Sequence, residues 1–257
     1  MKIKNAKIWT KEHGFVSGGV VFDERIQSLG DVGGADALDA KGMYLIPGFV
    51  DIHIHGGLKR DFSDAEAEGN AIIAKRLVKH GVTSHLATTM TLPEESLSRA
   101  AALQDFGTID PHKSCCLGVH LEGPFFSYRK RGAQIPEYLH DPDAEMYHRI
   151  NEACGGRVKM IAVAPELENG MDFIERVSRE TTVSLGHTCA EYDTAMEAFR
   201  RGANHVTHLF NGMDPFLHRA PGVVGAAMDS NAYVELICDG LHIHPSVVRA
   251  VFKMFPE

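Results

Sequence analysis

The chain has 257 residues, of which 44% are hydrophobic and 23% charged, and its formal net charge at pH 7 is −8. Such a chain can bury a sizeable core in one large domain with room for a small accessory domain, and its interspersed charges, without a basic run, argue against a nucleic-acid partner. No apolar stretch is long enough to span a bilayer and the N-terminus lacks a signal-peptide pattern, so we expect no membrane partner and a cytoplasmic location.

The sequence changes its rhythm near residue 43. Residues 1–43 carry short β-like runs such as "KIKNAKIWT", separated by glycine and aspartate, and predict a small β-domain. From Tyr44 on, apolar β-branched runs alternate with helical patterns at the spacing of βα units. Seven strands are predicted, at residues 44–55, 82–90, 115–123, 158–166, 182–188, 205–211 and 233–243. Helices are expected at residues 67–81, 92–106, 171–180, 191–202 and 245–255.

This alternation predicts an α/β fold, a TIM-like (β/α)8 barrel over residues 44–257 in which seven βα units are visible and the eighth is missing. Residues 1–43 would form a small β-sandwich domain that is incomplete without strands from the C-terminal side. Without an eighth strand, the first and seventh strands would keep unpaired edges. We therefore expect the chain to be truncated relative to a longer parent protein.

Polar residues with metal-binding chemistry stand at the ends of the predicted strands, where barrel enzymes build their active sites. They are His53 and His55 after the first strand, Glu122 after the third, His187 after the fifth, His208 after the sixth, and Asp239 and His242 after the seventh. Residues i and i+2 of a strand point to the same face, so His53 and His55 can grip one ion. Eight other histidines are expected to have surface or core roles: His13, His80, His85, His112, His140, His148, His205 and His218.

Imidazole nitrogens and carboxylate oxygens are ligands of catalytic zinc and iron sites. Glu122 could bridge two ions, and His187 and His208 could complete a second site. Each motif alone has an ordinary explanation, because an H-x-H pair arises by chance among fifteen histidines and a glutamate after a strand can belong to a helix cap. Four strands would have to place such ligands at their ends by accident, so the combination predicts a site for one or two divalent ions.

The segments "PGFVDIHIHGG", "GVHLEGPFF", "SLGHT", "VTHLFNGM", "HRAPGVVGAAMD" and "ICDGLHIHP" occur in this order. With them, the chain resembles the amidohydrolase superfamily and, within it, the N-acetylglucosamine-6-phosphate deacetylase family. The resemblance covers essentially the whole chain. "HLEGPF" followed by "GHT" and "THLFN" is specific to this subgroup, since related dihydroorotases and hydantoinases usually use a carboxylated lysine in place of the glutamate.

The resemblance implies that Glu122, His187 and His208 hold the principal metal and that His53 and His55 hold a second one. The implied ions are zinc or iron, with manganese or cobalt as alternatives. The remaining implied site residues have different partners. His242 would polarise the acetyl carbonyl, Asn211 and Gly212 would touch the sugar phosphate, Arg219 would reach the site of a neighbouring subunit in a homodimer, and Gln134 replaces a histidine near the sugar.

The implied activity is the metal-dependent hydrolysis of the acetamide of N-acetyl-D-glucosamine 6-phosphate, a step of amino-sugar catabolism and cell-wall recycling. In the family the general acid and base is an aspartate at the end of the eighth strand, and no residue here takes that role, since Asp239 belongs to the seventh-strand loop. Two alternatives stay open. One is another amide hydrolase of the superfamily, which "FNGM" and "HRAPG" disfavour, and the other is a catalytically silent fragment that binds metal or sugar phosphate.

Overall fold

The computed structural model describes residues 1–255. Their contacts divide the chain into two compact units that meet in sequence between Phe49 and Val50. Within the described part of the chain, every helix is too short or too polar to cross a membrane. The assignment of residues 1–43 as a separate domain stays a prediction.

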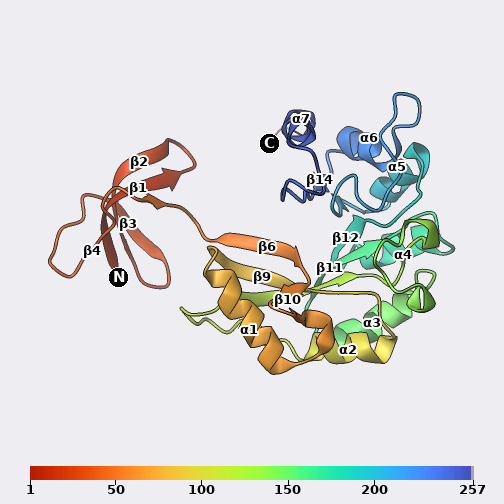
Figure 1. Ribbon diagram of the computed structural model, residues 1–257, viewed down its shortest axis with the longest axis horizontal. Coiled ribbons are helices and arrows are strands. Elements are labelled where there is room, and N and C mark those ends of the chain that lie inside the picture. Colours follow the sequence, from red (N-terminus) through yellow and green to blue (C-terminus); the bar gives the residue numbers. More distant parts are fainter. Residues whose placement is uncertain (256–257) are drawn as a thin grey trace. The chain divides into compact units, whose positions relative to one another are not determined.

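The first unit is one five-stranded sheet (Figure 1). Its strands are β1 (Lys2–Thr10), β2 (Gly14–Phe22), β3 (Ile26–Gly30), β4 (Leu38–Asp39) and β5 (Tyr44–Leu45). Strands β1, β2 and β3 are antiparallel neighbours, while β4 and β5 both pair in parallel with β1. Alternation along β1 and β2 turns Ala6, Ile8 and Val20 toward a small core with Ala40. Within residues 1–49 no second sheet covers this one.

The second unit is built on a seven-stranded sheet whose strands lie side by side in chain order (Figure 1). These are β6 (Phe49–Ile54), β9 (Val82–Thr89), β10 (Cys115–Glu122), β11 (Val158–Val163), β12 (Thr182–Leu185), β13 (His205–Val206) and β14 (Tyr233–Val234). Neighbours from β9 to β14 pair in parallel. The predicted α/β architecture with seven strands is confirmed, although β13 and β14 are much shorter than the predicted runs.

Helices follow the strands, as the βα pattern requires, and α1, α2 and α3 lie along one side of the sheet (Figure 1). The α-helices are α1 (Ala67–Val78), α2 (Glu94–Ala102), α3 (Ala144–Ala153), α4 (Gly170–Val177), α5 (Tyr192–Arg200), α6 (Gly222–Ser230) and α7 (Pro245–Met254). The loop after β6 carries the short strands β7 (Gly56–Gly57) and β8 (Arg60–Asp61) and the 3-10 helix η1 (Phe62–Asp64), and the loop after β10 carries η2 (Tyr128–Lys130) and η3 (Pro136–Tyr138). Helices α3 and α6 are not among the predicted elements.

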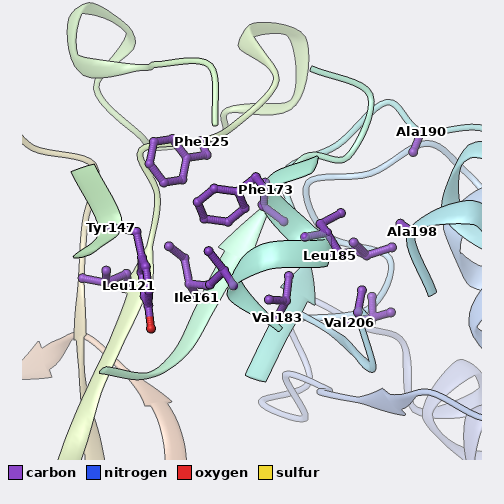
Figure 2. Packing of buried hydrophobic residues seen from close by; sticks show 14 of the residues in the cluster. Leu121, Phe125, Tyr147, Ile161, Phe173, Val183, Leu185, Ala190, Ala198 and Val206 are labelled. Carbon is purple, nitrogen blue, oxygen red and sulfur yellow. The ribbon is translucent and has the colours of Figure 1, made fainter. Parts of the chain in front are cut away.

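The main core lies between the sheet and its helices (Figure 2). Phe173 of α4 packs edge-on against Phe125, with ring centroids 5.0 Å apart, and against Tyr147 of α3 at 6.3 Å. Leu121 of β10 belongs to this core and is fully buried. Because successive strand residues face opposite sides, His120 and Glu122 point away from the helices and toward the other face of the sheet.

Candidate metal centre

Four of the five predicted ligands, all histidines, converge on the carboxylate of the fifth, Glu122. Glu122, at the end of β10, is 3% exposed. Its Oε1 atom lies 3.2 Å from His53 Nε2, 3.3 Å from His187 Nε2 and 3.0 Å from His208 Nε2, and its Oε2 atom lies 3.1 Å from His55 Nε2. The structure therefore brings together the histidines at the ends of β6, β12 and β13 around the glutamate that ends β10.

Backbone carbonyls decide which nitrogen of two of these histidines faces Glu122. His187 Nδ1 donates to the carbonyl of Lys130 at 2.9 Å, and His208 Nδ1 donates to the carbonyl of Asn211 at 3.1 Å. In neutral rings this leaves both Nε2 lone pairs 3.1 Å apart and beside the Glu122 carboxylate. Lone pairs held this close repel one another unless a cation lies between them. The residues therefore fit a divalent ion.

The backbone of the ligand loops adopts conformations that most side chains avoid. His187 has φ 48° and His208 has φ 30°, which place both in the left-handed region. The two strands also approach closely before these turns, because a Cβ at Gly186 would lie 2.9 Å from the Cβ of Thr207. At both histidines the chain leaves the extended conformation, and this directs their rings toward Glu122. For this reason β13 ends at Val206 and not at the predicted residue 211.

The charges of the cluster are strongly coupled. Burial raises the pKa of the Glu122 carboxyl, but hydrogen bonds from the surrounding histidines outweigh burial and bring this pKa well below its ordinary value. Burial lowers the pKa of His53, yet its hydrogen bonds to Glu122 and Glu235 bring that pKa up to about 10. A proton on His53 therefore balances part of the buried negative charge, and an incoming cation would have to displace it.

The described residues contain three groups whose ligand atoms lie within 4.8 Å of one another and could hold a metal ion. Two of them are the predicted sets, namely His53, His55 and Glu122, and Glu122, His187 and His208. The third consists of His53, His120 and Glu235. His120 and Glu235 are absent from the predicted site, although their positions offered signals: His120 lies two residues before Glu122 on the same strand face, and Glu235 directly follows β14.

Gln134 lies inside the cluster. It is 3% exposed, its Nε2 donates to Glu122 Oε2 at 2.7 Å, and its Oε1 accepts from the backbone amide of Thr91 at 2.7 Å. Asn211 turns its side-chain amide onto the carbonyls of His208 and Leu209. Gly212, with φ +60°, accepts from the amide of Thr188.

The other predicted site residues lie at the surface. His242 is half exposed, and its Nδ1 lies 2.7 Å from Asp239 Oδ2. Asp239 also accepts from the amides of Leu241 and His242, and these backbone bonds lower its pKa to about 2. Arg219 is exposed and lines a surface hollow of ≈ 730 Å³ with Tyr192 and Asp214. Its predicted role in a neighbouring subunit's site stays a prediction.

A family model described as the amidohydrolase family matches residues 44–254. N-acetylglucosamine-6-phosphate deacetylase of Bacillus subtilis (strain 168) is 39% identical over 214 residues, which cover 81% of this chain and 54% of that protein. The chain spans little more than half the length of the curated relatives that it matches.

Two solved structures are similar over almost the whole chain. The N-acetylglucosamine-6-phosphate deacetylase of Pasteurella multocida is 30% identical with a TM-score of 0.90, and the match covers 99% of this chain and 69% of that one. A mutant of the Mycobacterium smegmatis enzyme in complex with N-acetyl-D-glucosamine-6-phosphate is 29% identical with a TM-score of 0.85, and the match covers 99% of this chain and 68% of that one.

Proposed function

The chain belongs to the amidohydrolase family, and on that premise we propose that the protein hydrolyses the acetamide of N-acetyl-D-glucosamine 6-phosphate to D-glucosamine 6-phosphate and acetate. The observation that carries the proposal is the convergence of four imidazoles on the buried Glu122 carboxylate. The named activity of the similar proteins, and the substrate complex of one of them, support the choice of substrate.

In this proposal Glu122, His187 and His208 hold the principal divalent ion, and His53 and His55 hold a second one beside the same glutamate. Zinc or iron is the expected ion, and manganese and cobalt are alternatives. A divalent ion bound there would activate a water molecule and polarise the acetyl carbonyl. Gln134, which already donates to Glu122, would hold that carboxylate in place and line the sugar side of the site.

In the same proposal, the residues outside the metal cluster contact the acetyl oxygen and the phosphate of the substrate. Asp239 fixes the ring of His242, which would stabilise the negative charge that develops on the acetyl oxygen. Backbone amides around Asn211 and Gly212 would bind the phosphate, together with Arg219 from the neighbouring subunit of a homodimer. We also propose that the enzyme works in the cytoplasm.

One observation favours a second function, the binding of metal and sugar phosphate without turnover. Proton transfer to the leaving amine requires a general acid and base. Asp239 is unsuited to that role, since its two oxygens already accept from two backbone amides and from His242.

Acetate release from N-acetylglucosamine 6-phosphate by the zinc-loaded chain tests the proposal. We expect turnover that exceeds the turnover of unphosphorylated N-acetylglucosamine, and a fall in kcat of about 10²-fold in His242→Asn. The matched control is His244→Asn, an exposed histidine two residues further along that contacts Ser246 and should leave kcat unchanged. Bound zinc without acetate release would overturn the activity and favour the binding function.

A further inference from the structure

The carboxylate of Glu235 contacts the His53 ring at Nδ1, whereas Glu122 contacts the same ring at Nε2. Its side chain is 12% exposed, and its Oε2 atom lies 2.6 Å from His53 Nδ1. The same oxygen accepts from the backbone amide of His208 at 3.3 Å. One carboxylate therefore ties a histidine of each predicted ligand set, His53 of the first and His208 of the second.

The contact decides which nitrogen of His53 is free. An ionised carboxylate can only accept, so when an ion displaces one proton from the His53 ring, the proton that remains sits on Nδ1. The Nε2 atom is then left for the cluster, where it lies 3.2 Å from Glu122 Oε1. A carboxylate that holds the far nitrogen of a ligand histidine sets its tautomer and orientation and increases its basicity.

His120 supports the same ring from a second direction. It is fully buried, its ring meets that of His53 edge-on at 4.7 Å between centroids, and its Nδ1 donates to the carbonyl of Ile52 at 3.1 Å. This bond holds the backbone directly before His53. His53 is thus fixed by Glu235 through its ring and by His120 through both its ring and its strand.

His53, His120 and Glu235 could instead hold an ion of their own. His53 Nδ1 would then have to give up the proton that it donates to Glu235, and the ring would have to serve two ions at once. The short contact between His53 and Glu235 favours a hydrogen bond over a shared ion.

We propose that Glu235 is a positioning residue for the second ion: it fixes His53 with Nε2 toward the cluster. The inference rests on the proposed function, in that it takes the Glu122 cluster as the metal centre. Loss of Glu235 should weaken the ion held by His53 and His55 and leave the ion held by His187 and His208 nearly unchanged.

The test is a zinc titration of the full 257-residue chain after chelator treatment, for the wild type, Glu235→Gln and Glu235→Leu. We expect two ions per wild-type chain, with the affinity for the weaker one reduced by about 10-fold in Glu235→Gln and by about 100-fold in Glu235→Leu. The glutamine variant keeps the shape and one acceptor oxygen, so it remains informative if the leucine variant fails to fold. Glu180→Gln is the matched control, since Glu180 accepts from His148 Nε2 at 3.0 Å on the surface, and it should bind zinc like the wild type.

A ¹⁵N NMR measurement of the His53 tautomer, assigned with His53→Gln, reports the mechanism directly. We expect the proton on Nδ1 in the zinc-loaded wild type and a loss of this preference in Glu235→Leu. Wild-type affinities and tautomer in the glutamine and leucine variants would overturn the inference, as would three zinc ions per chain or a wild type that binds none. Neither measurement depends on turnover. If the Glu235 variants lose the second ion selectively and no chain releases acetate, this inference is supported and the proposed activity is overturned.

Discussion

At the scale of single residues, the orientation of the predicted ligand His187 depends on a neighbour that is not itself a predicted ligand. Gly212 has φ +60° and lies against the His187 ring, so that an added Cβ would be 3.0 Å from His187 Nδ1. That nitrogen donates to the Lys130 carbonyl and thereby turns Nε2 toward Glu122. Glycine is therefore required at this position for two reasons, its backbone conformation and its lack of a side chain.

We expect Gly212→Ala to weaken zinc binding by about tenfold, because the displaced His187 ring loses its orientation. Gly155→Ala is the matched control, since Gly155 has φ +64° and nothing within 4 Å of an added Cβ. Both substitutions should lower the free energy of unfolding by about 1–2 kcal/mol through backbone strain alone. Zinc titrations that give equal affinities for the two variants would show that the ring contact does not matter.

His85 makes the folded protein sensitive to acid. It is 1% exposed, stacks on Phe62 at 5.3 Å and bonds to Ser114, and burial lowers its pKa to about 4 from the ordinary 6.5. Between these two values the unfolded chain binds a proton that the folded chain does not. The contribution of His85 to stability is therefore constant above pH 6.5 and decreases as the pH falls toward 4.

We expect this group to cost about 2 kcal/mol of unfolding free energy between pH 7 and pH 5, at about 1.4 kcal/mol per pH unit below 6.5. Urea unfolding at both pH values, with chelator present, measures the loss. His85→Gln should reduce it by about that amount, whereas His80→Gln, at an exposed position, should not. An unchanged pH dependence in His85→Gln would contradict the assignment.

At the scale of elements, all seven strands of the main sheet in the second unit were predicted and two helices were not. Continuous apolar runs mark buried parallel strands, and all seven are present in the second unit. Helix α6 is apolar on nearly all sides and contains glycine, so it lacks the amphipathic stripe that marks a surface helix. Helix α3 begins at Ala144 and is capped by Asp143, whose side chain accepts from the amides of Glu145 and Met146, so an aspartate at this position is a sequence signal for a helix start.

Helix α4 is fastened to the core by Phe173, which is 2% exposed and packs on Phe125 and Tyr147. We expect Phe173→Ala to lower the unfolding free energy by about 3–5 kcal/mol, since the cavity left between helix and sheet cannot close fully. Phe252→Ala in α7 is the control, because Phe252 is 71% exposed and should change stability by less than about 1 kcal/mol. Similar urea midpoints for the two variants would refute this description of the core.

At the scale of the whole second unit, the sheet must curl for its site to exist. Strands β6 and β14 stand at opposite ends of the strand order, yet His53 at the end of β6 lies 2.6 Å from Glu235 directly after β14. The proximity of the five predicted ligand residues could be expected from the sequence, because the carboxyl ends of parallel strands share one edge. The contacts of Glu235 and His120 with His53 could not be predicted from the strand order. They depend on how closely the curl of the sheet brings the outer strands together.

The central claim is that Glu122 organises a divalent-metal centre, and the zinc content of the purified chain tests it most directly. Zinc-loaded wild type, Glu122→Gln and the surface control Glu180→Gln would be dialysed against metal-free buffer and compared, with circular dichroism confirming that each is folded. Because Glu122 contacts both pairs of histidines, we expect the wild type and Glu180→Gln to retain zinc and Glu122→Gln to lose it from both sites. A folded Glu122→Gln chain that retains as much zinc as the wild type would contradict the account.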